Sequence, residues 1–193
     1  MIVINKERVK AIVFIHGFYA NAGFWLNYID YFKEYCLIFL NIDFLNNYKI
    51  DTEKTLFNDI VKKKGYDIIA VISHSLGTFF SSTFLLSKNI IQYDICPIGI
   101  GGNIDESRFV NSISLKTNQS EEIILNDLKL IKYQYFDAPF FENSDNKILY
   151  IPDSDDYFNY YDSVFLKVYF SGDHFNINNA IIDIKIRLES KTI

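Results

Sequence analysis

Apolar runs bounded by turn signals recur along this chain, and they alternate with segments whose apolar residues have helical spacing. A strand that is apolar throughout is buried on both faces, as in a parallel sheet that helices cover on either side. The pattern therefore predicts an α/β fold with a mostly parallel sheet and helices on both of its faces. The predicted strands are residues 11–15, 36–42, 67–72, 95–100, 147–151 and 164–170.

The segments between these runs carry helix signals. Residues 24–32 place five large apolar side chains at helical spacing. Residues 56–65 end in three lysines followed by Gly65, which is typical of a helix C-cap. Residues 76–86 follow a predicted strand directly and are compatible with a further helix.

One stretch interrupts the alternation of strands and helices. Residues 103–146 are more polar than the rest, and a helix is predicted around 120–132. A chain of 193 residues is the size of one ordinary domain. We therefore predict a single domain over residues 1–193, in which 103–146 form a small lid-like insertion.

Composition excludes several classes of protein. With 49% hydrophobic residues the chain is expected to be globular, and a net charge of −5 argues against a nucleic-acid-binding protein. Cys36 and Cys96 lie in apolar runs and have neither disulfide nor metal-site spacing. The charged N-terminal residues and the short apolar runs predict neither a signal peptide nor a membrane span, so a cytoplasmic location is expected.

The sequence Ser73-His74-Ser75-Leu76-Gly77 lies between a predicted strand and a predicted helix. It matches the pattern G-x-S-x-G except that Ser73 replaces the first glycine. In that pattern the central serine is a nucleophile exposed on a sharp turn, and small residues on either side let strand and helix approach. Ser75 is therefore a candidate nucleophile; the alternative interpretation is a serine that caps the helix.

His16 and Gly17 directly follow the first long apolar run. In hydrolases of this topology, the loop at that position supplies one amide of the oxyanion hole, and the residue after the nucleophile supplies the other. Those amides belong to Phe18 and Leu76. We expect His16 to brace the loop rather than to transfer protons; the alternative is a simple tight turn.

His174 is the third of three histidines and follows the last apolar run, where a general base is expected. The orienting acid should follow the preceding strand, where Asp153, Asp155 and Asp156 occur. In the usual arrangement of a strand followed by G-x-x-D, Asp156 takes the place of the acid, so it is the first candidate and Asp155 the second. Taken alone, this acidic cluster also fits a solvated turn.

The chain resembles the α/β-hydrolase family over nearly its whole length. The resemblance lies in the order His16-Gly17, Ser75-x-Gly77, Asp156 and His174, each of which follows a predicted strand. It implies an α/β-hydrolase fold and a serine hydrolase that cleaves a carboxylic ester or thioester through an acyl-enzyme. Such chemistry needs no metal or other cofactor.

More narrowly, the segments HGFYANAGFW and SHSLG are similar to those of the pimeloyl-[acyl-carrier protein] methyl ester esterases of biotin synthesis. In that family the oxyanion loop often ends in tryptophan, and Trp25 occupies the equivalent place. The resemblance places His16 and Trp25 at the substrate pocket, and implies a small acyl ester as substrate and an acyl-carrier protein as partner. The bases of the insertion, Arg108, Lys116, Lys129 and Lys132, are matched by at least as many acids, so charge alone does not decide on such a carrier.

A second class of function fits the same fold. Ser73 in place of glycine, Thr78 after the motif and the short insertion are departures from the family pattern. They are compatible with a non-catalytic member of the fold that binds a ligand or a protein.

Overall fold

The computed structural model describes residues 1–84, 90–97, 104–132, 146–155 and 166–190. Within these ranges, seven strands form one sheet in the order β1-β3-β2-β4-β5-β6-β7. Strand β1 pairs with β3 antiparallel, and all other neighbours pair parallel. The predicted mostly parallel sheet is confirmed. The strands are β1 (Ile2–Ile4), β2 (Lys10–Ile15), β3 (Cys36–Leu40), β4 (Asp67–His74), β5 (Ile91–Ile95), β6 (Lys147–Pro152) and β7 (Leu166–Phe170).

Strand β5 lies earlier in the chain than predicted. It ends at Ile95, because Cys96 leaves the extended conformation with a φ of 49°. The prediction over residues 95–100 was therefore wrong in position, and its last three residues lie outside the described part. The apolar pattern that would have predicted β5 is interrupted by Gln92 and Asp94, two polar residues that are buried in the fold. Strand β1 was not predicted either.

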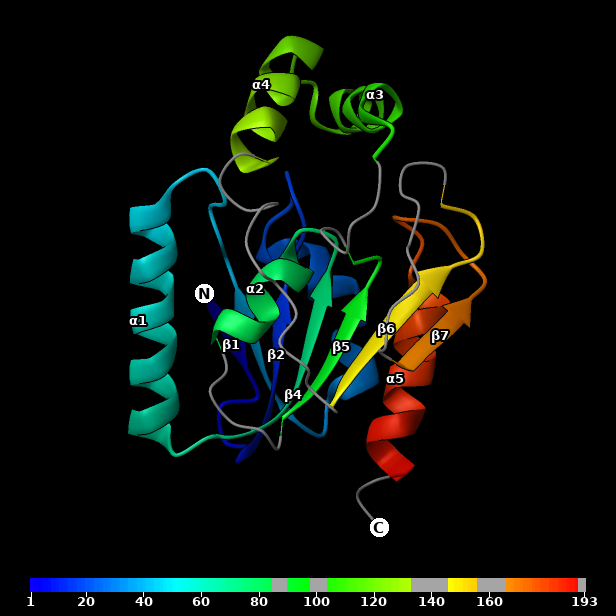
Figure 1. Ribbon diagram of the computed structural model, residues 1–193. Helices are drawn as coiled ribbons and strands as arrows, with labels where there is room; N and C mark the ends of the chain where they lie inside the picture. The colour runs from blue at the N-terminus through cyan, green and yellow to red at the C-terminus, as the bar shows by residue number, and fades with distance from the viewer. Residues whose placement is uncertain (85–89, 98–103, 133–145, 156–165, 191–193) are drawn as a thin grey trace.

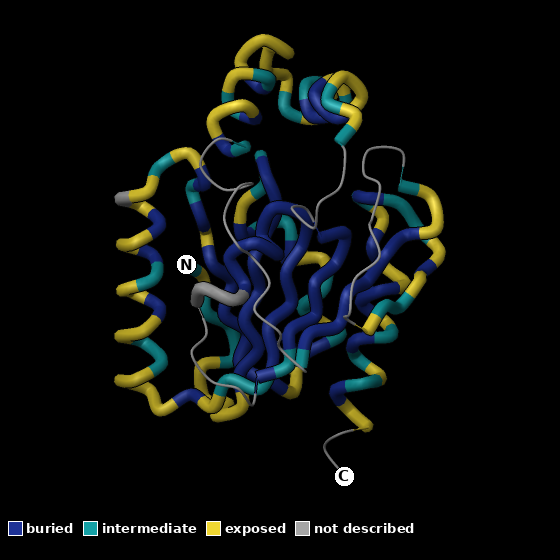
Figure 2. The backbone as a smooth tube through the Cα atoms, viewed as in Figure 1, coloured by how far each residue is buried: buried dark blue, intermediate teal, exposed yellow. Residues whose placement is uncertain are grey.

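Helices cover both faces of the sheet, whose central strands are buried (Figures 1 and 2). Alternate residues of β2 pack against different helices. Val13 and Ile15 pack in one buried cluster with residues of α1 and α2, whereas Ile12 and Phe14 pack in another with residues of η1 and α5. This alternation is the two-residue period of a strand that is buried on both faces. The flanking helices are the 3₁₀-helix η1 (Ala22–Phe32), α1 (Asn47–Lys64), α2 (Gly77–Phe84) and α5 (Asn178–Ser190).

Local capping explains where α1 begins and ends. The Asn46 side chain accepts a hydrogen bond from the Lys49 amide at the first turn. Gly65 has a φ of 67° after the last turn, and its amide donates to the Val61 carbonyl. The C-cap predicted at Gly65 is confirmed.

Residues 103–146, the predicted insertion, contain α3 (Glu106–Thr117) and α4 (Glu121–Ile131), which lie beyond the carboxyl ends of the parallel strands (Figure 1). The α4 helix was predicted and α3 was not. The sequence signal for the start of α3 is Asp105, whose carboxylate accepts a hydrogen bond from the Arg108 amide. Buried residues of both helices, among them Phe109 and Leu128, belong to the same cluster as the core of α1 and α2. None of the helices in the described ranges is both long and apolar enough to cross a membrane.

Candidate active site

Ser75 lies in the sharp turn between β4 and α2, and its backbone has a φ of 54°. This left-handed conformation costs a residue with a side chain about 1–3 kcal/mol. Hydrogen bonds hold it in place. The Ser75 amide donates to the Ile95 carbonyl (2.9 Å), and the Thr78 amide and hydroxyl donate to the Ser75 carbonyl (3.1 and 2.7 Å). The strand-turn-helix setting predicted for Ser75 is therefore present.

Two glycines let the loop after β2 lie directly against this turn. A Cβ atom on Gly77 would overlap the His16 carbonyl oxygen and lie 2.7 Å from that of Ile15. A Cβ atom on Gly17 would lie 2.8 Å from the Ser75 Cβ atom. Side-chain carbons do not approach other heavy atoms this closely, so both positions require glycine.

Ser73, the departure from the family pattern, has a buried polar partner. Its hydroxyl donates to Asp94 of β5 at 2.5 Å, and the other oxygen of Asp94 lies 3.1 Å from the Lys147 ammonium of β6. All three side chains are buried. A buried charge is tolerated when it is paired and hydrogen-bonded, so serine can replace glycine here because β5 supplies an acceptor.

The side chains of Ser75, His174 and Asp155 form one hydrogen-bonded line. His174 Nε2 lies 2.9 Å from Ser75 Oγ, and His174 Nδ1 lies 3.0 Å from Asp155 Oδ2. These residues follow β4, β7 and β6, whose carboxyl ends meet at one edge of the sheet. An ionised carboxylate only accepts hydrogen bonds, so Nδ1 donates to Asp155 and Nε2 is left to accept from the Ser75 hydroxyl.

The sequence favoured Asp156 as the acid and kept Asp155 as the second candidate. Asp156 lies outside the described residues, whereas Asp155 pairs with His174. The turn after β6 is fastened to the loop after β7. The Asp153 carboxylate accepts from the Gly172 amide (3.1 Å), and the Ser154 hydroxyl donates to the Gly172 carbonyl (2.5 Å). This turn directs the Asp155 side chain toward His174.

His16 braces the loop after β2, but it is buried and is not among the described residues that line the cavity beside Ser75, where the resemblance had placed it. Its Nδ1 donates to the Gly17 carbonyl (2.9 Å), and its Nε2 accepts from the Ile42 amide just beyond β3 (3.0 Å). Burial, opposed by the bond to Gly17, lowers the pKa of His16 to about 4. The ring is therefore neutral near pH 7 and has both nitrogens engaged.

His74 holds the backbone of the loop that carries His174. Its Nε2 donates to the His174 carbonyl (2.7 Å), and its ring stacks on Phe24 at 4.9 Å. Among the described atoms its buried Nδ1 has no hydrogen-bond partner. Burial, together with the nearby His174, lowers the pKa of His74 to about 3, so this ring is neutral as well.

Because His16 and His74 are kept neutral in the folded protein, we expect its free energy of unfolding to fall in mild acid. In the unfolded chain each binds a proton near pH 6.5, whereas the folded protein excludes it until about pH 4 and about pH 3. The unfolded state therefore binds more protons below pH 6.5, and the free energy of unfolding falls as the pH drops through that window. Two such protons contribute a slope approaching about 2.7 kcal/mol per pH unit.

Urea unfolding measured between pH 7 and pH 4.5 tests this expectation. Carboxylates also contribute to the slope, so the wild-type protein is compared with His74→Gln, in which an amide can still donate to the His174 carbonyl. We expect the slope of the variant to be smaller by about 1.4 kcal/mol per pH unit, the value for one proton. Equal slopes in the two proteins would show that His74 is not kept neutral by the fold.

A cavity of about 240 Å³ adjoins Ser75 and His174, and we call it the Ser75 pocket. Most of its surface is apolar, and the α3 helix of the insertion forms part of its wall. Such a volume suits an acyl group of modest length. Its apolar lining includes Phe18, Phe24, Phe109, Ile113 and Phe175.

The other residues predicted at the site are placed as follows. Phe18 lines the Ser75 pocket, and Leu76 directly follows Ser75 in the turn just before α2. Trp25 is fully buried in the core, where it packs against Phe14 at 5.3 Å, and its neighbour Phe24 lines the pocket instead. Helical spacing alone could not tell which of these two aromatic residues faces the pocket.

Tyr19 links the loop after β2 to the insertion, a role that the sequence did not reveal. Its backbone has a φ of 55°, and its hydroxyl donates to the Asp127 carboxylate of α4 (2.5 Å). The neighbouring Phe18 ring stacks with Phe109 of α3 at 6.3 Å. The backbone beside Ser75 and the insertion are thus joined by one polar and one aromatic contact.

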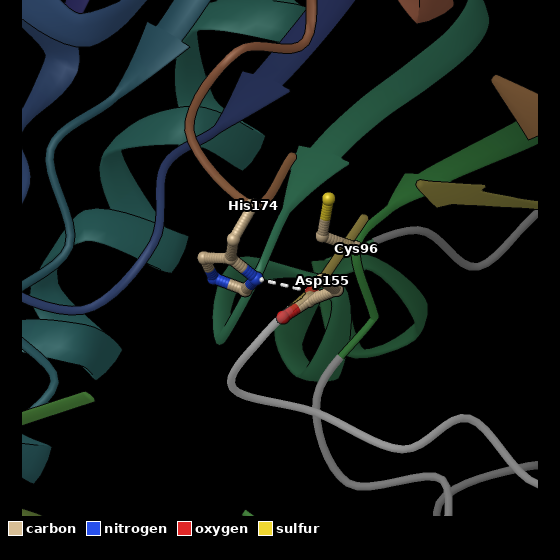
Figure 3. Close-up of side chains that lie close together, drawn as sticks. All are labelled: Cys96, Asp155 and His174. Atoms are coloured by element: carbon tan, nitrogen blue, oxygen red, sulfur yellow. Dashed lines mark hydrogen bonds and ion pairs between the residues drawn. The ribbon is translucent and has the colours of Figure 1, made fainter. Parts of the chain in front are cut away.

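Cys96 completes a group of potential metal ligands with Asp155 and His174 (Figure 3). One ligand atom of each lies within 4.8 Å of the others, and a thiolate, an imidazole and a carboxylate together suit a soft divalent metal such as zinc. A metal held by these three side chains would compete with the hydrogen bond between His174 and Asp155 that this structure contains. Metal binding and the line from Ser75 to Asp155 are therefore mutually exclusive uses of His174.

Comparisons with known proteins place the fold. No protein-family model matches the chain, and no curated protein matches its sequence. Solved structures do match. The thioesterase domain of NocB, in a covalent complex with a fluorophosphonate nocardicin G analogue, is 11% identical with a TM-score of 0.64, and the match covers 97% of each chain.

Two further solved structures come from named organisms. An esterase of Pyrococcus furiosus is 14% identical with a TM-score of 0.56, over 97% of this chain and 82% of that one. An extracellular alpha/beta-hydrolase from a Paenibacillus species is 13% identical with a TM-score of 0.53, over 93% and 98%. The chain therefore has the α/β-hydrolase fold that the sequence resemblance predicted.

Proposed function

We propose that this protein is a serine hydrolase that cleaves a carboxylic ester or thioester through an acyl-enzyme. The observation that carries the proposal is the hydrogen-bonded line from the Ser75 hydroxyl through His174 to Asp155, next to an apolar pocket. A serine hydroxyl becomes a nucleophile when a base lies within hydrogen-bond reach and a third group orients that base.

In the first half of the proposed reaction, Ser75 Oγ attacks the acyl carbonyl while His174 Nε2 takes the hydroxyl proton. Asp155 holds the Nδ1–H tautomer and stabilises the imidazolium that forms. The amides of Phe18 and Leu76 donate to the developing oxyanion. The bond to the alcohol or thiol then breaks, and His174 protonates that leaving group.

In the second half, water attacks the acyl-enzyme and gives its proton to His174. The bond between the acyl carbon and Ser75 Oγ breaks, the serine regains its proton and the carboxylic acid leaves. The buried, neutral His16 and His74 exchange no proton in this scheme. They support the two loops that flank Ser75, since each is bonded to a backbone group of one of them.

The narrower proposal is a pimeloyl-[acyl-carrier protein] methyl ester as substrate, hydrolysed in the cytoplasm. It rests on the resemblance of residues 16–25 and 73–77 to the esterases of biotin synthesis. The thioesterase and esterase named above have the same fold, which supports either leaving group equally. We therefore propose the ester or thioester hydrolase as the function and regard the carrier-bound substrate as one member of that class.

A fluorophosphonate probe tests the proposed function directly, because it bonds covalently to an activated serine. We expect intact-protein mass spectrometry to show one label, and peptide mapping to place it on Ser75. The label should be lost in His174→Ala, in which the base is missing. Ser107→Ala, which changes an exposed serine on α3, is the matched control and should be labelled like the wild-type protein.

The non-catalytic alternative makes the opposite prediction. A binding protein with this fold would remain unlabelled although circular dichroism showed it to be folded. Labelling of Ser75 that persisted in His174→Ala would also contradict the proposal, because the serine would then react without its base.

A further inference from the structure

Two cavities share the side chains of Lys116 and Phe175. One is the Ser75 pocket, which is mostly apolar. The other, which we call the outer cavity, has a volume of about 520 Å³ and a more polar wall. The two cavities are therefore adjacent at Lys116, and the outer one provides the more polar surroundings. The outer cavity is lined by Lys116, Phe175, Ser112, Asp173, Asn176 and Asn178, among others.

Lys116 belongs to the last turn of α3, and its ammonium lies 2.8 Å from the centre of the Phe175 ring. This contact holds the positive charge at the boundary between the two cavities. Apart from histidines, it is the one cationic side chain among the described residues that line either cavity.

Within the described part of the chain Lys116 forms no ion pair, although Asp173 lines the same cavity and its field acts on the ammonium. Asp173 is the one carboxylate among the described residues that line the two cavities. Its Oδ1 accepts from the amides of Phe175 and Asn176 (2.7 and 2.9 Å), which holds the loop after His174 in place. Burial lowers the pKa of Lys116 and the field of Asp173 opposes the change. A partly desolvated cation that contacts an aromatic ring but is paired with no carboxylate among the described residues can still bind an anion.

We propose that Lys116 binds an anionic group of the substrate, so that the protein selects acyl esters or thioesters that carry a carboxylate or a phosphate beyond the scissile carbonyl. The inference rests on the proposed function, since it assigns the Ser75 pocket to the acyl carbonyl. The charge can come from the acyl side, as in a half-ester of a dicarboxylic acid, or from the leaving group, as in a phosphorylated thiol. Either source presents the same chemistry to the ammonium.

Two matched substrate pairs separate these sources. For the acyl side, kcat/KM is compared for mono-p-nitrophenyl glutarate and p-nitrophenyl pentanoate. For the leaving group, it is compared for acetyl-coenzyme A and S-acetyl-N-acetylcysteamine. We expect the anionic-to-neutral ratio to fall about tenfold in Lys116→Met for one of the pairs, which identifies the source of the charge. Lys116→Glu, which reverses the charge, should lower that ratio further.

Lys129→Met is the control, since Lys129 is an exposed lysine of α4 that lines neither cavity. Its ratios should equal those of the wild-type protein. Ratios within about twofold of wild type for both pairs in both Lys116 variants would overturn the inference.

The inference is also testable without catalysis. If the wild-type protein hydrolyses none of the four compounds, the proposed hydrolase fails, and calorimetric binding of glutarate and of coenzyme A then decides about Lys116. Binding of either compound that weakens about tenfold in Lys116→Met supports the anion site. Absence of binding, or equal binding in both proteins, overturns it.

Discussion

Replacement of Ser75 by alanine is expected to lower the turnover of a short acyl ester about a million-fold. A serine–histidine–aspartate unit acts as a whole, so the loss of its nucleophile removes nearly all of its contribution, and only oxyanion stabilisation and binding remain. The variant should fold, because the bonds that hold the turn join backbone atoms of Ser75 and the Thr78 hydroxyl, all of which alanine leaves in place. Hydrolysis of p-nitrophenyl acetate, together with a thermal melt, measures both properties.

Ser107→Ala again serves as the comparison, since Ser107 is an exposed serine whose hydroxyl donates to Asp105. Its rate should remain within about twofold of wild type, as is usual for a surface change away from the site. If Ser75→Ala kept the wild-type rate while folded, the hydrolysis would have another origin and the proposed mechanism would be lost.

Much of the fold followed from the sequence because its central strands are buried on both faces. Residues 11–15 and 36–40 are apolar throughout, and such runs have few other uses in a globular chain. The position of strand β5 was predicted wrongly because the strand buries Asp94, whose partners Ser73 and Lys147 come from two neighbouring strands. A buried ion pair between strands leaves no local signal, so the strand was predicted at residues 95–100 rather than at Ile91–Ile95.

The site was predictable where geometry follows from the backbone path. Ser75 and His174 each come directly after a strand, and the carboxyl ends of parallel strands meet at one edge of the sheet. Side-chain direction was not predictable to the same degree. Trp25 and Phe24 are adjacent, and only the packing of η1 on Phe14 decides that Trp25 enters the core while Phe24 stacks on His74.

The choice of the acid was open for a related reason. The residues after β6 include three aspartates within four positions, and spacing to the strand favoured Asp156. The hydrogen bonds of Asp153 and Ser154 to Gly172 fasten this turn to another loop, a long-range contact that no local pattern reports. That contact directs Asp155 toward His174. Replacing Asp155 should therefore impair catalysis much more than replacing Asp156.

Replacement of Asp155 by asparagine is expected to lower kcat about ten-thousand-fold, with a far smaller effect on KM. An asparagine amide can donate to Nδ1, which favours the wrong tautomer of His174 and places a proton on the nitrogen that must accept from Ser75. The imidazolium of the transition state also loses its carboxylate partner. The steady-state rate of p-nitrophenyl acetate hydrolysis at pH 8 measures the effect.

Asp156→Asn is the matched comparison, since it makes the same chemical change one residue later. If Asp155 orients His174, this second variant should lose no more than about tenfold, because it removes only a nearby charge. The reverse order of effects would identify Asp156 as the acid. It would mean that the turn after β6 rearranges when substrate binds, since the carboxylate paired with His174 in this structure belongs to Asp155.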